Sequence, residues 1–90
     1  MTEQAPSVGR IVHYTVGDGE VRAINELRGN TVQAGDVLAA VIVRVWSVEN
    51  GCANLRVLLD GPDVYWATSR VRDPGGATYQ GGTWHWPERV

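Results

Sequence analysis

The segment from Val37 to Ser47 constrains the fold of this chain more than any other part of the sequence. It reads VLAAVIVRVWS, and its density of β-branched residues favours a strand over a helix. Side chains alternate between the two faces of a strand, so apolar residues would lie on both sides. A strand of this kind is expected inside a sheet, with a partner on each edge. Its two faces are predicted to carry Val41, Val43 and Val45 on one side and Ile42, Arg44 and Trp46 on the other.

Four other segments alternate apolar and polar residues in the manner of half-buried strands. They span residues 9–16, 53–59, 64–72 and 83–86, and turn sequences rich in Gly, Asp, Asn and Pro lie between the segments. One face of each segment is expected to point into the core. In the first two segments those faces carry Val12, Tyr14 and Val16, and Leu55, Val57 and Leu59.

The last of these segments places a histidine between two tryptophans. In extended backbone Trp84 and Trp86 share one face, and His85 points to the other. Each indole can bury a large area, so the pair would close the core or form the floor of a ligand groove. We therefore expect the two rings to hold the C-terminal tail against the domain.

Residues 20–34 allow two interpretations. Val21, Ile24 and Leu27 have the spacing of a short helix that begins after the preceding turn. The sequence Arg28-Gly29-Asn30-Thr31 is equally typical of a turn that joins two short strands. We favour the hairpin, because the segments on both sides are β-like.

The predicted fold is all-β, a small antiparallel meander that closes into an SH3-like barrel or a curled sheet. Closure is favoured because an open sheet edge invites aggregation. Ninety residues suffice for one small domain with a modest core. We expect residues 1–7 to form a flexible N-terminal arm and residues 8–90 to form the single domain, with the helix or hairpin at 20–34 as an excursion.

The charge of the chain limits the classes of partner that it is expected to bind. The net charge is −2, so no basic field favours binding to nucleic acid or to a membrane surface. All eight basic residues are arginines, which suit bidentate anion contacts and stacking on aromatic rings. Cys52 is the single cysteine, which excludes an internal disulfide. The longest apolar run, 37–43, is too short to span a bilayer, and we expect a soluble protein made in the cytoplasm.

No motif predicts catalysis. His13 and His85 are the only histidines, and they would form half of a metal site if the first and last strands pair. A metal site needs three or four ligands, and no Cys or carboxylate stands at a suitable spacing. Each histidine is therefore expected to hydrogen-bond a neighbour, and we expect no catalytic residue, no metal and no cofactor.

Aromatic and arginine residues exceed what a core of this size needs. Tyr65 and Trp66 are adjacent, so one of them must point away from the core. Three arginines share the outward parity of two tryptophans in neighbouring predicted strands, and together they would bind an anionic ligand or an acidic patch. The alternative is that all four tryptophans fill the core or its rim. The candidate binding residues are Arg44, Trp46, Arg56, Trp66, Arg70, Trp84, His85 and Trp86.

Several segments, taken in order, resemble a family of small uncharacterised proteins that tailed bacteriophages and prophages encode, common in actinobacterial phages. The segments are GRIVHY at 9–14, AVIVRVW at 40–46, NLRV at 54–57 before Asp60-Gly61, Trp66 with Thr68-Ser69, and GTWHWPE at 82–88. The last is the most specific. This chain departs from the family by a longer excursion at 17–38 and a shorter loop at 60–63. The resemblance implies a phage context and carries over no activity.

These observations together predict a phage-encoded, non-enzymatic binding module. Its Arg/aromatic face would bind a host protein or a small anionic ligand, including a nucleotide signal in the evasion of host defence. We expect it to act as a homo-oligomer in the host cytoplasm, without membrane or nucleic-acid partners. The alternative is a structural protein of the virion, such as a capsid decoration or head–tail accessory protein.

Overall fold

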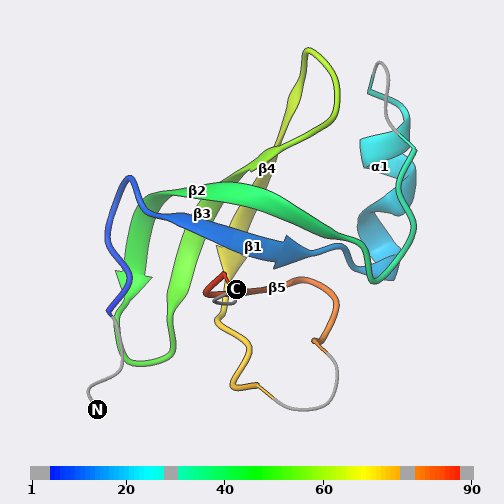
Figure 1. The fold of residues 1–90 in the computed structure, drawn as a ribbon. Coiled ribbons are helices and arrows are strands. Elements are labelled where there is room, and N and C mark those ends of the chain that lie inside the picture. Colours follow the sequence, from blue (N-terminus) through cyan, green and yellow to red (C-terminus); the bar gives the residue numbers. More distant parts are fainter. Residues whose placement is uncertain (1–4, 28–30, 76–78, 88–90) are drawn as a thin grey trace.

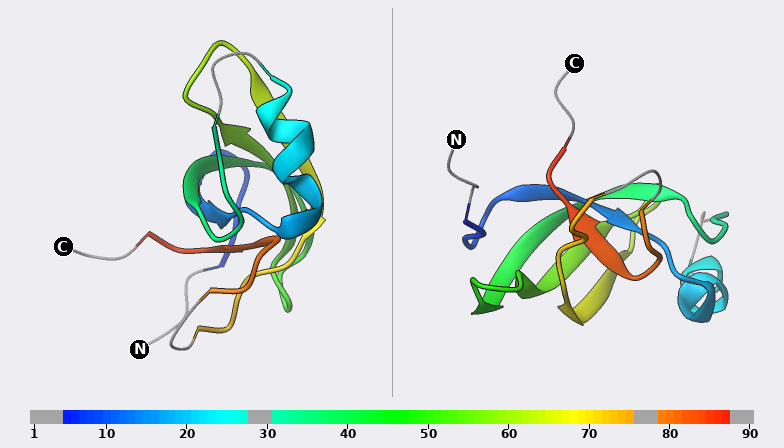
Figure 2. Two further views of the ribbon diagram at one scale, coloured as in Figure 1. Left: turned by 90° about the vertical axis from the view of Figure 1, so that its right-hand side faces the viewer. Right: turned by 90° about the horizontal axis from the view of Figure 1, so that it is seen from below.

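The main feature of the computed structural model is a five-stranded antiparallel sheet (Figure 1). The structure describes residues 5–27, 31–75 and 79–87. The strands lie in the order β4-β3-β2-β1-β5, so β1 pairs with both the second strand and the last. The sheet curls strongly, and the helical segment stands at one end of it (Figure 2). This arrangement confirms the predicted all-β class and the curled antiparallel meander. The elements are β1 (Ile11–Thr15), the 3₁₀ turn η1 (Asp18–Glu20), α1 (Val21–Asn25), β2 (Val37–Ser47), β3 (Cys52–Leu58), β4 (Val64–Arg70) and β5 (Thr83–His85).

A short contact after β4 brings the two edges of the curled sheet together. Arg72 pairs in parallel with Trp84 of β5. The Trp84 amide donates to the Val71 carbonyl at 3.2 Å, and the Asp73 amide donates to the Trp84 carbonyl at 2.8 Å. The predicted strand 64–72 therefore ends as a regular ladder at Arg70 and continues as this bridge. Backbone groups that an open edge would expose are satisfied there.

The core lies inside the curl and is centred on the tail. Trp84 is the largest fully buried side chain, and its indole N–H donates to the Gly51 carbonyl at 2.8 Å. The tail is therefore anchored as predicted, because withdrawing this ring would expose a large apolar area. The alternation predicted for the first strand and for β3 is confirmed at its buried positions. The fully buried residues around the ring are Val12, Tyr14, Ala40, Ile42, Ala53, Leu55, Val57 and Ala67.

The last strand folds back against the first. His85 lies opposite His13 in the β1–β5 register, and Trp84 lies opposite Tyr14. The rings of Trp84 and Trp86 meet edge to face, with centroids 5.2 Å apart. The prediction that these two indoles share one side of the chain is therefore confirmed.

Irregularities in the pairing of β2 with β3 change the faces predicted for β2. One lies between Ile42 and Arg44, and another lies between Val45 and Ser47. A bulge adds a residue to one strand and reverses the alternation beyond it. Ile42 is fully buried, Val43 is exposed, and Val45 packs against the core. The prediction that Val45 shares a face with Val43 is wrong for this reason.

A short helix, and not a hairpin, forms in the excursion at residues 20–34. Ile24 of α1 is fully buried against Val16 and Val32. The Asn25 side chain fastens the helix to the returning chain, since Nδ2 donates to the Val32 carbonyl at 3.0 Å and Oδ1 accepts from the Val32 amide at 2.7 Å. The hairpin prediction is wrong because the apolar residues of this segment form a cluster of their own. Residues 28–30 of the predicted turn lie outside the described residues.

The predicted N-terminal arm is described only in part. Residues 1–4 lie outside the described residues, and Pro6 is buried. The Gly9 amide donates to the Ile42 carbonyl at 2.8 Å, and the Ile42 amide donates to the Arg10 carbonyl at 3.0 Å. Contacts to the sheet therefore begin close to the boundary predicted for the domain.

Candidate functional site

The outer surface of β2, β3 and β4 carries four of the predicted binding residues. The strand registers place Val41, Arg56 and Trp66 side by side, and Ile11 of β1 extends this row across a fourth strand. The residues Trp46 and Trp66 are 53% and 55% exposed. Of the adjacent pair Tyr65 and Trp66, Trp66 points away from the core and Tyr65 packs against it. We call the surface formed by Arg44, Trp46, Arg56 and Trp66 the Arg–Trp face.

Each indole of the Arg–Trp face is paired with a guanidinium group. The guanidinium carbon of Arg44 lies 4.0 Å from the centre of the Trp46 ring, which is within the range of a cation–π contact. The guanidinium carbon of Arg56 lies 6.0 Å from the Trp66 ring, near the outer limit of such contacts. Stacking orients a guanidinium and leaves its N–H edge able to bind a carboxylate or phosphate.

The charges of the described residues are divided between strands and connections. Histidine aside, arginine is the only ionisable charged residue type within the five strands. The carboxylates of the described residues lie in turns, in the helical segment and in the loop after β4. The outer surface of the sheet is therefore locally cationic, although the net charge of the chain is −2.

One buried amide supports the Arg–Trp face from β3. The Oδ1 atom of Asn54 accepts hydrogen bonds from Trp46 Nε1 at 3.0 Å, from Thr68 Oγ1 at 2.9 Å and from the Ser69 amide at 2.8 Å. Asn54 is buried, so these donors satisfy an oxygen that would be costly to leave unpaired. The same side chain thus orients the Trp46 ring and holds the backbone at Ser69.

Arg70 does not belong to the Arg–Trp face. The β3–β4 register shifts between Ala53 and Leu55, and Ser69 of β4 has a left-handed φ of 55°. The irregularity reverses the alternation, which turns Arg70 to the opposite side of the strand from Trp66. The prediction that Arg70 shares the outward parity of Trp66 is therefore wrong.

Arg70 instead enters a polar network at one end of the curled sheet. Its Nε donates to the Tyr14 hydroxyl at 2.9 Å, its Nη2 donates to Glu20 Oε1 at 3.1 Å, and its Nη1 donates to the Thr68 carbonyl at 3.0 Å. The Tyr14 hydroxyl donates to Glu20 Oε2 at 2.5 Å, and the Gly17 amide donates to the same oxygen at 2.7 Å. We call this group the Tyr14–Glu20–Arg70 network.

Burial and charge shift the titration of this network. Burial raises the pKa of the Tyr14 hydroxyl well above its ordinary value, and the hydrogen bond to Glu20 adds to the shift. Burial also raises the pKa of Tyr65, with the charge of Glu20 as the next cause. Burial acts to lower the pKa of Arg70, but the contacts with Tyr14 and Glu20 outweigh it, and the pKa is raised. Both phenols are therefore neutral at neutral pH, and the guanidinium is charged.

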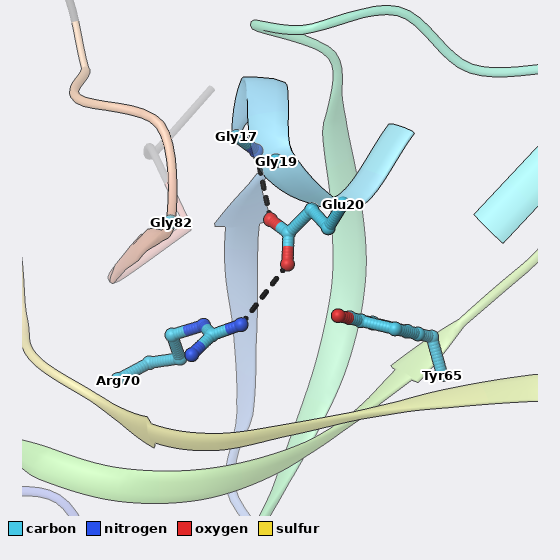
Figure 3. A pocket seen from close by; sticks show the side chains of 6 residues that line it. All are labelled: Gly17, Gly19, Glu20, Tyr65, Arg70 and Gly82. Atoms are coloured by element: carbon cyan, nitrogen blue, oxygen red, sulfur yellow. Dashed lines mark hydrogen bonds and ion pairs between the residues drawn. The ribbon is translucent and has the colours of Figure 1, made fainter. Parts of the chain in front are cut away.

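An open pocket of about 340 Å³ lies beside the network (Figure 3). Figure 3 shows Glu20 between the η1 turn and Arg70, with the Tyr65 hydroxyl turned toward the carboxylate. Gly82, just before β5, lines the other side. The lining residues are Gly17, Gly19, Glu20, Tyr65, Arg70 and Gly82.

Tyr14, Glu20 and Tyr65 were not among the candidates that the sequence singled out. Glu20 follows Gly17 by three positions, which is the spacing of a helix-capping glutamate, and this was the signal available. Its partner Arg70 is fifty positions away in the chain. Capping explains the Gly17 contact, but only the fold brings the arginine to the carboxylate.

The terminal candidates lie away from the Arg–Trp face, on β5 and just beyond it. Trp84 is fully buried and His85 is buried, so neither is open to a partner in this structure. Trp86 is half-buried, and the guanidinium carbon of Arg10 lies 5.2 Å from its ring. Because β1 separates β5 from β2, these residues and the Arg–Trp face do not form one site.

The two histidines meet, as the pairing of the first and last strands requires. The His13 and His85 rings are perpendicular, with centroids 5.7 Å apart, and Tyr79 stacks on His85 at 3.5 Å. Among the residues that the structure describes, no three His, Cys, Asp or Glu side chains gather closely enough to hold a metal ion. Two of the partners of His85 are therefore aromatic rings, His13 from β1 and Tyr79 from the segment before β5.

Comparisons of the chain with protein-family models, with curated proteins and with solved structures give no match. Within ranges 5–27, 31–75 and 79–87, no helix is long and apolar enough to cross a membrane. Two surfaces of the described residues, the Arg–Trp face and the pocket, are therefore the candidates for a function.

Proposed function

We propose that this chain is a phage-encoded, non-enzymatic binding module that uses the Arg–Trp face to bind an acidic surface of a host protein in the host cytoplasm. The observation that carries the proposal is the pair of guanidinium–indole contacts on an exposed face whose strands hold no carboxylate. The phage context is supported by the resemblance of the terminal GTWHWPE segment and the strands before it.

The composition of the face is that of an interface centre. Trp46 and Trp66 expose more than half of their surface, and apolar residues of the neighbouring positions are exposed beside them. Contiguous exposed apolar surface marks interaction sites, and tryptophan and arginine dominate the residues that carry binding energy. The exposed apolar neighbours are Ile11, Val43, Leu58 and Val64.

A protein surface fits this face better than a small anion does. Small-molecule sites are concave and bury most of their ligand, whereas this face is the outer surface of three adjacent strands. The loss of Arg70 to the interior leaves Arg44 and Arg56 as its cations, each beside an indole. Cations interspersed with rings are complementary to a partner patch that carries both carboxylates and apolar groups.

The test compares two variants with matched loss of charge. The double variant Arg56→Ala/Trp66→Ala removes one guanidinium–indole pair, and Arg22→Ala removes an arginine whose side chain is 93% exposed on α1. Host proteins captured by the parent chain are identified, purified and measured against both variants. We expect the double variant to bind about tenfold or more weakly, Arg22→Ala to bind like the parent, and added salt to weaken binding. A double variant that keeps every partner contradicts the proposal.

Three further measurements test the alternatives and the oligomeric state. Mass spectrometry of purified virions detects the chain if it is a decoration or head–tail protein. Titration with a nucleotide such as adenosine diphosphate detects sequestration of a small anion, and we expect no binding that depends on Trp66. Sedimentation equilibrium of the parent and the Arg56→Ala/Trp66→Ala variant tests homo-oligomer formation and shows whether the Arg–Trp face is used for it.

A further inference from the structure

We propose that the pocket beside the Tyr14–Glu20–Arg70 network is a second site, independent of the Arg–Trp face, that binds a neutral hydroxylated ring of the size of a pentose or hexose. Arg70 is turned away from the Arg–Trp face, so the two sites share no side chain. Failure of one proposal therefore leaves the other intact.

The size and rim of the pocket suit a small ring. Its volume of about 340 Å³ is at the lower end of the range for small-molecule sites. A side chain at Gly17 would be crowded, because a Cβ there would lie 3.2 Å from the Gly82 amide nitrogen. Gly19 is not crowded in this way, since an added Cβ would meet no atom within 4 Å. The absence of a side chain at Gly19 thus leaves the pocket open without serving a packing need.

The charges of the pocket disfavour ions. The Glu20 carboxylate and the Arg70 guanidinium are 3.1 Å apart, so their charges largely cancel at the pocket wall. A free anion would gain little net attraction from Arg70, and a free cation little from Glu20, to offset the cost of leaving water. A neutral ligand meets neither penalty and still finds strongly polar groups.

The hydrogen-bonding capacity that Glu20 and Arg70 retain suits ligand groups that both donate and accept hydrogen bonds. Within the described residues, Glu20 Oε2 accepts hydrogen bonds from two donors and Oε1 accepts one from Arg70, and a carboxylate oxygen accepts about two hydrogen bonds. Arg70 uses three of its five N–H groups within the described chain. A hydroxyl group can donate to Oε1 and accept from the guanidinium at once, and neighbouring hydroxyls on one ring repeat this pattern.

The other walls complete the match. Tyr65 lines the pocket with its hydroxyl turned toward Glu20, which adds a third polar group beside the pair (Figure 3). Its ring adds a flat apolar surface suited to the C–H face of a sugar. Glu20 is held by Tyr14, Gly17 and Arg70 before any ligand arrives, so the site loses little freedom on binding.

The experiment is a titration followed by ¹H–¹⁵N correlation spectra. The probes are methyl β-D-ribofuranoside and methyl α-D-glucopyranoside, with inorganic phosphate and ethanolamine as charged controls. We expect saturable shifts of the Gly17, Gly19 and Gly82 amides, with a dissociation constant of roughly millimolar size because the probes are small. The glycoside that binds with the lower dissociation constant shows whether the natural ring is a nucleoside ribose or a hexose.

Three variants connect the shifts to the pocket. Gly19→Leu fills the rim where the fold has room, and we expect it to abolish the saturable shifts. Tyr65→Phe keeps the ring and removes one hydroxyl, and we expect several-fold weaker binding. Arg56→Ala/Trp66→Ala leaves the pocket unchanged and is expected to bind like the parent.

The proposal is overturned by any of three results. The first is that neither glycoside shifts the pocket amides. The second is that phosphate or ethanolamine shifts these amides more strongly than the glycosides do. The third is that Gly19→Leu binds a glycoside as tightly as the parent does. Circular dichroism of Gly19→Leu establishes that the variant is folded, and the Tyr65→Phe measurement tests the same site without a change of backbone.

Discussion

The Arg–Trp face and the Tyr14–Glu20–Arg70 network use arginine in opposite ways. On the face, Arg44 and Arg56 stand on the outer surface beside exposed indoles. In the network, the side chains of Arg70 and Glu20 are 28% and 7% exposed, and hydrogen bonds join them to Tyr14. The guanidinium groups of the face can contact another molecule, whereas the guanidinium group of Arg70 forms hydrogen bonds within the fold.

The difference shows how burial decides what an arginine contributes. An exposed cation–π contact contributes about 0.5–1 kcal/mol, because water screens the cation. Removal of one partner from a buried charge pair costs several kcal/mol, since the other charge remains unpaired away from water. The network is therefore expected to govern stability, and the face is expected to govern binding.

The largest expected effect comes from breaking the network at its carboxylate. Glu20→Ala leaves Arg70 and Tyr14 without their common acceptor, and we expect a loss of about 2–4 kcal/mol in the free energy of unfolding. The matched control is Glu26→Ala, which breaks the exposed Glu26–Arg22 pair at 3.3 Å and should cost about 0.5 kcal/mol or less. Urea denaturation of both variants gives the comparison. Equal losses would show that burial does not separate the two ion pairs.

A single hydroxyl sharpens the same comparison. Tyr14→Phe removes the group that donates to Glu20 and accepts from Arg70, and we expect a loss of about 1–2 kcal/mol. Tyr65→Phe, at the open pocket, should cost less than that. Because burial raises the pKa of Tyr14, its contribution is present below the ordinary tyrosine pKa of about 10 and falls as the pH rises above it. A stability profile of Tyr14→Phe that still declines as steeply there argues against this assignment.

A carboxylate in the loop after β4 extends the comparison to acid pH. Asp73 Oδ1 accepts from the Gly75 amide at 2.8 Å and Oδ2 accepts from the Gln80 amide at 2.7 Å, and these bonds lower the pKa of Asp73. Its contribution is therefore present above the unfolded pKa of about 4 and is lost as the pH falls through the lower folded value. We expect Asp73→Asn to cost about 1 kcal/mol at neutral pH and to flatten the acid limb of the stability curve.

The control for this acid dependence is the exposed Asp18. Asp18→Asn removes the same charge at an exposed position at the start of η1, and so tests the change of charge alone. Thermal denaturation between about pH 6 and pH 2 measures both variants against the parent. The assignment fails if the two substitutions flatten the curve equally.

The smallest effect on stability is expected on the Arg–Trp face. Arg56→Ala should change the free energy of unfolding by less than about 1 kcal/mol, because the 6.0 Å contact with Trp66 is exposed. Arg44→Ala, which loses the closer 4.0 Å contact with Trp46, should cost slightly more than Arg56→Ala. Denaturation curves resolve the order. A loss comparable to that of Glu20→Ala would make the face part of the stabilising core and not a binding surface.

The sequence by itself determined the five strands, though not the helix at 21–25, and the residues that the inner faces of two of these strands bury. The span 37–47 is the same in the prediction and in the structure, and the burial of Val12, Tyr14, Leu55 and Val57 follows from simple alternation. The contact of Arg44 with Trp46 follows from their spacing on one strand. Such features depend on residues that are neighbours in the chain, so local pattern and turn residues suffice to place them.

Only the tertiary structure decided where the alternation is interrupted. The bulge at Ser69 is held by Asn54, fifteen residues earlier, and it sends Arg70 inward to meet Glu20, fifty residues away. Neither partner is visible from the sequence around Arg70. A one-residue change of register reverses every side chain beyond it, and the register is set by hydrogen bonds between strands, so the inner network and the pocket exist only once the strands have paired.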